Sequence, residues 1–135
     1  MTTDTIDLEI VTPERLVVKV AANEVVIPGS EGYFGVLPGH APLLTVLGAG
    51  ELSYRVESGW SYLAVAGGFA EVLRSSVSVL AETAERPDEI DEERARREKV
   101  EAEAAQMTET SESGQRRAQE KLDRAVARLK VRGRN

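Results

Sequence analysis

The composition of the chain changes abruptly at Arg86-Pro87, and this change allows only a fold with two unlike parts. Before it, short apolar stretches are separated by glycine and proline, a pattern typical of strands joined by turns. After Pro87 the chain has no proline and no aromatic residue, and alanine, glutamate, arginine, lysine and glutamine dominate. These residues are strong helix formers. We therefore expect an α+β chain of two domains, with strands in residues 1–86 and helices in residues 87–135.

The first part contains many short stretches whose apolar residues recur with the two-residue period of half-buried strands. The clearest is Ile6–Ile10, in which apolar and acidic residues alternate. Gly67-Gly68 predicts a bulge or a close backbone approach, while Trp60 and Phe69 are expected in the core or on a sheet face. Regularly spaced short strands predict an all-β sandwich or barrel. The expected strands are residues 6–10, 16–20, 25–27, 43–47, 52–56, 60–66, 69–73 and 77–80.

Residues 28–44 carry the strongest turn signals in the chain. They include four of the eleven glycines, three of the five prolines and the only histidine, His40. Glycine permits positive φ angles, and proline fixes φ and removes a backbone donor, so this segment cannot be a regular helix or a plain strand. We expect consecutive tight turns with short extended pieces between them, carrying a contact surface. His40 is either a turn residue bonded to nearby backbone or a contact residue for a partner.

The second part predicts two helices in a hairpin. The first helix should be capped by Asp88 and end near Met107. Residues 108–114 are polar and predict a linker, and a second helix is expected over residues 115–131. The chain from Gly133 onward is expected to fray. The apolar stripe of the second helix has helical spacing and consists of Ala118, Leu122, Ala125 and Leu129.

The charges of the two helices differ in sign. Residues 88–112 carry ten acidic and four basic side chains, whereas residues 113–135 carry two acidic and eight basic ones. Packed antiparallel, the helices attract each other, although their apolar contact is thin and made mostly of alanine. Each exposed ion pair contributes only about 0–1 kcal/mol, and isolated helices of this length are marginally stable in water. We therefore hypothesise a hairpin that can open or dock elsewhere.

Several classes of function are disfavoured by what the sequence lacks. Without cysteine there is no thiolate chemistry, and a single histidine leaves no catalytic triad and no histidine metal cluster. No P-loop occurs, so we expect no catalytic residue, no metal and no enzyme activity. The net charge of −6 disfavours nucleic-acid binding. No stretch reaches the roughly 18 apolar residues of a membrane span, and no signal peptide is found, so we expect an intracellular protein without direct insertion into the bilayer.

One basic arrangement has two interpretations. Four residues of the second helix fall on one face, and Arg94 and Arg97 project from the first helix. The arrangement is either a solvated basic face opposite an acidic helix or an anion site that exists only while the hairpin is closed. The four residues are Arg117, Lys121, Arg124 and Arg128.

Residues 29–32 (GSEG) and 35–43 (GVLPGHAPL) form a long segment rich in glycine and proline. This segment resembles the signature of the epsilon subunit family of the rotary F-type ATP synthases of bacteria and chloroplasts. Residues 66–72 (AGGFAEV) are similar to its later Gly-Gly segment, and residues 124–131 (RAVARLKV) to its last helix. The resemblance implies an antiparallel β-sandwich of about ten strands followed by an α-helical hairpin.

The resemblance also implies a non-catalytic subunit of the central stalk of a proton-transporting ATP synthase. Its sandwich would bind the gamma subunit on one side and the membrane c-ring on the other, and its hairpin would be regulatory. When extended, the hairpin would reach the catalytic alpha and beta subunits and block ATP hydrolysis. The subunit would be peripheral, on the cytoplasmic face of the bacterial inner membrane or the stromal face of the thylakoid. The implied partner-contact residues are Glu31, Gly32, Tyr33, Phe34 and His40.

Residues 90–95 (IDEERA) are similar to the [I/L]-D-x-x-R-A motif with which the family binds ATP. The resemblance implies a regulatory ATP and no required cofactor. Glu101 stands where some nucleotide-binding relatives carry a further arginine. The alternative to a stalk subunit is a free-standing nucleotide-sensing module with a β-sandwich and a helical hairpin. The implied ligand residues are Ile90, Asp91 and Ala95 around the adenine, and Arg94, Arg124 and Arg128 at the adenine or the phosphates.

Overall fold

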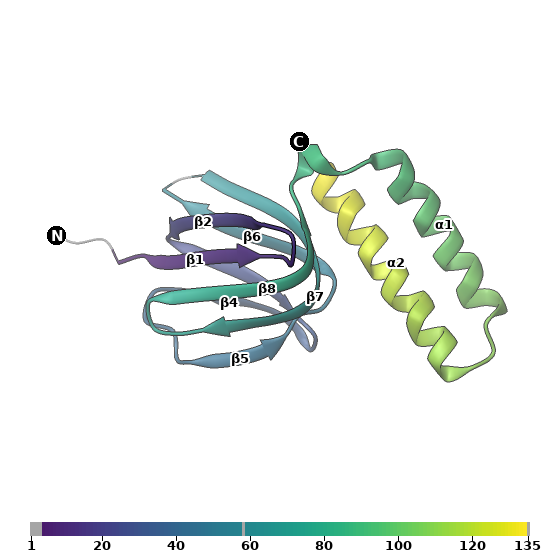
Figure 1. Cartoon of the computed structure of the whole chain (residues 1–135), viewed down its shortest axis with the longest axis horizontal. Coiled ribbons are helices and arrows are strands. Elements are labelled where there is room, and N and C mark those ends of the chain that lie inside the picture. Colours follow the sequence, from purple (N-terminus) through teal and green to yellow (C-terminus); the bar gives the residue numbers. More distant parts are fainter. Residues whose placement is uncertain (1–3, 58, 135) are drawn as a thin grey trace.

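The computed structural model describes residues 4–57 and 59–134, which form a β-sandwich followed by a helical hairpin (Figure 1). This arrangement confirms the expected fold class. Strands occupy the chain up to Glu85, and helices begin at Pro87. The strands are β1 (Ile6–Val11), β2 (Leu16–Ala22), β3 (Glu24–Gly29), β4 (Gly32–Val36), β5 (Leu43–Val46), β6 (Gly50–Val56), β7 (Gly59–Val72) and β8 (Ser76–Glu85).

The strands form one hydrogen-bonded sheet that folds over itself into two layers (Figure 1). The order is β2-β1-β8-β7-β6-β3-β4, with β5 paired to β7. All neighbours are antiparallel except β1 and β8. The core between the layers consists mainly of aliphatic side chains, as the low aromatic content requires. Ile10, Val25, Leu52, Leu63 and Val79 are fully buried there.

Strand β7 belongs to both layers because it changes partner at Gly67-Gly68. Its first half pairs with β6 and its second half with β5. Both glycines have positive φ angles, 72° and 93°, and a Cβ on Gly68 would lie 1.8 Å from the carbonyl oxygen of Leu80. The close approach predicted for this dipeptide is therefore confirmed. The stretches 60–66 and 69–73 are one strand, which helps explain why eight strands are described rather than about ten.

The turn-rich segment contains one short strand, β4, which is an extended piece of the kind expected between its turns. β3 and β4 form a tight hairpin in which Gly29 pairs with Gly32 and Pro28 with Tyr33. Proline fits within β3 because the pairing of β3 with β6 ends at Val26, so no sheet partner needs the missing donor. Tight turns with an extended piece are therefore confirmed for this segment.

Both helices end within one residue of the predicted ends, at Thr108 and Arg132, but they begin at other residues than predicted. Asp88 lies in a short 3-10 helix, η1 (Pro87–Glu89), and the cap of α1 (Glu92–Thr108) is Asp91, whose carboxylate accepts a hydrogen bond from the Arg94 amide. The predicted cap at Asp88 is wrong, since the residue three positions later meets the free amides. Ser111 caps α2 (Glu112–Arg132), so the connection is shorter than the predicted linker.

Alanine forms the seam between α1 and α2, as expected from their composition. Ala95 and Ala102 of α1 are buried, as are Ala118 and Ala125 of α2. α2 lies between the sandwich and α1 (Figure 1) and contacts β6 and β7. The large aromatic residues expected in the core or on a sheet face, Trp60 and Phe69, lie on the surface of the sheet, 40% and 46% exposed.

Candidate functional site

The apolar contact between hairpin and sandwich is small. It consists of Ile90, which follows η1, Val131 near the end of α2, and Ala64 of β7, with half-buried Tyr62 beside them. This cluster is separate from the core between the two layers of the sheet. A seam of this size stabilises docking only modestly because hydrophobic stabilisation scales with the apolar area removed from water.

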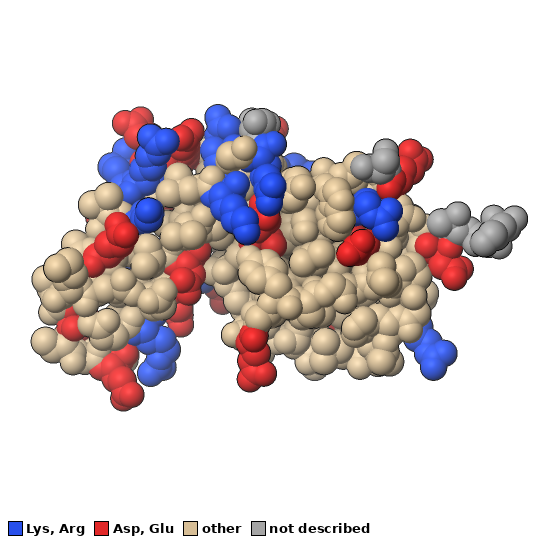
Figure 2. Space-filling view, turned by 180° about the vertical axis from the view of Figure 1, so that it is seen from behind, with Lys and Arg blue, Asp and Glu red and all other residues tan. Residues whose placement is uncertain are grey.

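Ion pairs make up much of the remaining contact. Arg124 binds Glu82 at 2.9 Å, and Arg128 binds Glu85 at 2.7 Å, both on β8. Arg128 also binds Glu98 of α1 at 2.9 Å, so it connects the two helices and the sandwich. The expected attraction between oppositely charged helices is thus represented by the Glu98 pair, while other basic side chains of α2 bind the sandwich. Figure 2 shows lysine and arginine gathered near this junction, beside a largely uncharged sandwich surface.

The end of the chain is held by a group that we name the Glu51 cluster, formed by Glu51, Tyr33, Tyr62, Lys130 and Arg134. Arg134 donates two hydrogen bonds to the Glu51 carboxylate, at 2.8 and 3.0 Å, and lies 4.3 Å from the Tyr62 ring centroid. Lys130 is 3.6 Å from the same carboxylate. The prediction that the chain frays from Gly133 onward is therefore wrong for Gly133 and Arg134, because a charge partner on β6 fixes Arg134 in place. Asn135 lies outside the described residues.

Among the described residues, Glu51 is the charged residue that is buried, with 7% of its surface exposed. The hydrogen bonds from Arg134 hold its pKa below the ordinary value, and the charges of Arg134 and Lys130 act in the same direction against the effect of burial. The carboxylate is therefore ionised at neutral pH and attracts the end of α2. The Tyr33 hydroxyl accepts a hydrogen bond from the Glu51 amide at 2.9 Å, which connects β4 to this cluster.

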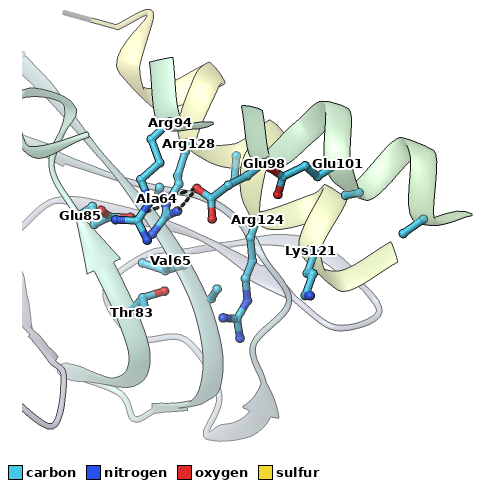
Figure 3. Close-up of a pocket in the computed structure, with 15 residues that line it drawn as sticks. Ala64, Val65, Thr83, Glu85, Arg94, Glu98, Glu101, Lys121, Arg124 and Arg128 are labelled. Carbon is cyan, nitrogen blue, oxygen red and sulfur yellow. Dashed lines mark hydrogen bonds and ion pairs between the residues drawn. The ribbon is translucent and has the colours of Figure 1, made fainter. Parts of the chain in front are cut away.

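A cavity of about 410 Å³ lies between the sandwich and the hairpin (Figure 3). One wall is formed by β7 and β8, and the other by α1 and α2. Its apolar lining is mostly alanine, and its polar lining has both signs of charge. Such a mixture of apolar wall and converging charged groups is typical of a small-molecule site. The charged lining residues are Glu85, Arg94, Glu98, Glu101, Lys121, Arg124 and Arg128.

The structure brings together the expected arginines but not all the expected ligand residues. The cavity lining includes Arg94, Arg124 and Arg128. Ile90 and Ala95 are buried and Asp91 caps α1, and these three lie outside the lining. Sequence reasoning missed Thr83 and the alanines of β7, since the pattern of a buried strand does not show where its end meets another element.

The basic face of α2 is divided. Lys121 lines the cavity together with Arg124 and Arg128, whereas Arg117 does not, and neither does Arg97 of α1. Glu101 also lines the cavity, so α1 contributes an acidic group to the wall that it forms together with the basic helix α2 (Figure 3). Among the described residues, no group of three acidic or histidine side chains has the arrangement of a metal site.

The expected partner-contact residues differ in their exposure and in the residues that they contact. Glu31 lies in the exposed turn between β3 and β4, exposed Gly32 begins β4, and half-buried Phe34 packs against the core. Tyr33 is 55% exposed, and Lys130 of α2 lies 5.9 Å from its ring centroid. His40 follows a turn, and its Nδ1 lies 2.6 Å from the Ala41 carbonyl oxygen, as expected for a turn residue bonded to nearby backbone. Its role as a contact residue for a partner stays a prediction.

An exposed apolar row crosses the outer face of one layer. Val46 of β5 pairs with Phe69 of β7, Phe69 pairs with Leu80 of β8, and Leu80 pairs with Val11 of β1. Val46 is 60% exposed and Leu80 44%. The sequence places these residues on strands, but strand periodicity cannot tell a covered face from an open one. An exposed apolar patch of this kind marks an interaction surface.

None of the described helices combines the length and the apolar character that crossing a bilayer requires. The longest helix, α2, is dominated by charged residues.

Family profiles match both parts of the chain. The profile described as ATP synthase, Delta/Epsilon chain, beta-sandwich domain matches residues 5–87. The profile described as ATP synthase, Delta/Epsilon chain, long alpha-helix domain matches residues 88–133. A chain of the Euglena gracilis mitochondrial ATP synthase, in a cryo-EM structure of OSCP, F1 and the c-ring, has the same fold, with a TM-score of 0.79 and 24% identity over 93% of this chain and 79% of that chain.

Curated relatives agree with the profiles. The ATP synthase epsilon chain of Koribacter versatilis (strain Ellin345) is 55% identical over 105 residues, 78% of this chain and 74% of the relative. The ATP synthase epsilon chain of Nitratidesulfovibrio vulgaris (strain DP4) is 48% identical over 128 residues, 93% of this chain and 94% of the relative. These matches confirm the resemblance seen in the glycine-rich segments, and the chain belongs to the ATP synthase delta/epsilon chain family.

Proposed function

We propose that this protein is the epsilon subunit of the central stalk of a proton-transporting ATP synthase, without an active site of its own. The observation that carries the proposal is the match to epsilon chains along both the sandwich and the hairpin. Reconstitution tests it: purified chain added to an epsilon-free ATPase complex binds with defined stoichiometry and couples ATP hydrolysis to proton pumping. A chain that does not bind the complex contradicts the proposal.

The apolar row of Val11, Val46, Phe69 and Leu80 is the surface that we assign to the gamma subunit. The exposure of Val46, Phe69 and Leu80 on neighbouring strands fits a protein partner. The turn-rich end of the sandwich, with Glu31, Gly32, Tyr33, Phe34 and His40, is assigned to the c-ring. Phe69→Ser weakens binding to isolated gamma subunit, whereas Val100→Ser, on an exposed part of α1, does not. Equal binding of both variants removes the assignment to gamma.

The hairpin is a regulatory element that lifts from the sandwich and then inhibits hydrolysis at the alpha and beta subunits. Two features support reversible docking. The Ile90–Val131–Ala64 seam is small, and the exposed ion pairs beside it contribute little free energy because water can replace each partner. The chain has no cysteine, so Ala64→Cys with Val131→Cys places its only two thiols in one contact cluster, where oxidation can crosslink them. In the complex, oxidation should abolish inhibition of ATP hydrolysis and reduction should restore it. Inhibition that persists in the crosslinked state contradicts a lifting hairpin.

ATP binds in the cavity when the hairpin is docked, with its phosphates at Arg94, Arg124 and Arg128. Ile90, Asp91 and Ala95 would reach the adenine, as the resemblance implies, by a local shift at the start of α1. The converging arginines and the 410 Å³ volume support this proposal. ATP that binds only the docked state would stabilise it by about 2.7 kcal/mol at a hundredfold excess over Kd.

Calorimetry of the isolated chain with ATP tests this site. Arg124→Ala abolishes binding, whereas Arg117→Ala, the same change of charge two turns earlier on α2 and outside the cavity, leaves it unchanged. Equal losses in both variants would indicate general electrostatic attraction to the basic helix instead of a site.

The protein is peripheral and is held at the membrane by the complex, on the cytoplasmic face of the bacterial inner membrane or the stromal face of the thylakoid. Its described helices are unsuited to a membrane span, which supports attachment through protein contacts. Phe69→Ser, which replaces one central residue of the apolar row, releases the chain from washed membranes. Retention of that variant on membranes stripped of the ATP synthase contradicts the proposal.

A further inference from the structure

The proposed anion site is already occupied by a carboxylate of the protein itself. Glu98 Oε1 lies 2.9 Å from Arg128 Nη1 and 3.7 Å from Arg94 Nε, between guanidinium groups that come from two helices (Figure 3). Arg128 is 24% exposed and also binds Glu85 at 2.7 Å. A phosphate oxygen bound by Arg94 and Arg128 would occupy the position that Glu98 now holds.

We propose that Glu98 is an intramolecular competitor for the anion of this cavity, so that a ligand must displace its carboxylate from Arg94 and Arg128. This inference rests on the proposed ATP site and names what regulates its occupancy. A single phosphate would replace the contacts of the Glu98 carboxylate with Arg94 and Arg128 by similar contacts, so its net gain in binding free energy is small. A polyphosphate reaches Arg94, Arg124 and Arg128 together, so the cavity selects nucleoside polyphosphates and related polyanions.

The opposite role for Glu98 predicts the opposite result. As a brace, Glu98 would hold α1 against α2 through Arg128, and its removal would loosen the hairpin and weaken every ligand. As a competitor, its removal takes the carboxylate away from Arg94 and leaves Arg128 paired with Glu85, and the released guanidinium N–H groups strengthen anion binding. The direction of the change in affinity therefore distinguishes the two roles.

The experiment compares wild type, Glu98→Gln and Glu92→Gln by calorimetry at fixed ionic strength, with inorganic tripolyphosphate, inorganic phosphate and ATP as probes. Glu92 is the matched control, because it lies on the same helix and binds Arg96 at 2.6 Å, and neither residue lines the cavity. Glu98→Gln should bind tripolyphosphate about five- to tenfold more tightly than wild type. Glu92→Gln should match wild type.

Two results overturn the inference. One is a Glu98→Gln chain that binds tripolyphosphate no more tightly than wild type. The other is a wild-type chain that binds inorganic phosphate as tightly as tripolyphosphate. The fate of the ATP site is read separately: if ATP binds no more tightly than tripolyphosphate while Glu98→Gln strengthens both, the adenine contacts are contradicted and the role of Glu98 is supported. Hydrogen exchange in α1 and α2 of the Glu98→Gln chain shows that the hairpin remains closed.

Discussion

The guanidinium of Arg134 forms two hydrogen bonds with the carboxylate of Glu51, at 2.8 and 3.0 Å, 83 residues away along the chain. Arginine and carboxylate match each other in this paired geometry, which makes such contacts directional. The contact lies at the end of α2, beside the seam of Ile90 and Val131. It therefore fastens the free end of the hairpin to β6.

Arg134→Met should release the end of α2 without unfolding the sandwich. The substitution removes both hydrogen bonds to Glu51 and the stacking of the guanidinium on Tyr62. We expect faster amide hydrogen exchange in the last turns of α2, with unchanged exchange in β1 and β8. Arg132→Met removes the same charge from the same end of the helix and serves as the control. Equal exchange in the two variants would show that net charge, not the Glu51 contact, holds the helix.

Docking of the hairpin should weaken in acid. The pKa of Glu51 is below the ordinary value of 4.5 because Arg134 binds the carboxylate, so its contribution to stability is present above that value and is lost as pH falls through the lower folded-state pKa. Glu89 behaves in the same way, since the Arg86 amide and Arg15 lower its pKa. We expect faster exchange in α2 below about pH 4.5. In Glu51→Gln, hydrogen exchange in α2 should be faster than in wild type at neutral pH and should depend less on pH. A pH profile of exchange identical to wild type would contradict the role of Glu51 in docking.

Gly68→Ala should destabilise the sandwich strongly. The φ angle is 93°, and a Cβ would lie 1.8 Å from the backbone carbonyl oxygen of Leu80, so β7 and β8 would have to separate. We expect a loss of more than about 2 kcal/mol in the free energy of unfolding, measured with urea. Gly35→Ala in β4 is the control, because nothing lies within 4 Å of the added Cβ. A loss at Gly35 as large as that at Gly68 would refute the explanation by steric contact.

Asp91→Ala should weaken α1, and Asp88→Ala should not. Asp91 accepts the hydrogen bond from the Arg94 amide, whereas Asp88 lies in η1. Loss of a side-chain cap costs about 1 kcal/mol. The measurement is hydrogen exchange in the first turn of α1, in which Asp91→Asn should restore protection. Similar effects of Asp91→Ala and Asp88→Ala would contradict the assignment of the cap to Asp91 alone.

Local patterns predicted much of the fold. Secondary structure depends mainly on interactions between neighbouring residues, so short sequence segments were enough to predict it. Examples are the alternation in Ile6–Ile10, the turn residues between Pro28 and Pro42 and the helix formers after Pro87. The glycine pair Gly67-Gly68 was also identified as a special position. Errors concentrate at element ends, where Asp91 replaces Asp88 as the cap and Ser111 shortens the connection.

By itself, the sequence determined the division at Arg86-Pro87, the strand and helix composition of the two parts and the family resemblance. Only the tertiary structure decided that Arg124, Arg128 and Arg134 bind carboxylates of the sandwich, and that Glu98 lies between two arginines at a cavity. The reason is physical. A helix pattern fixes which side chains share a face. The partner of a long charged side chain, however, lies on another element, 83 residues away for Arg134 and Glu51, and the two meet only after packing.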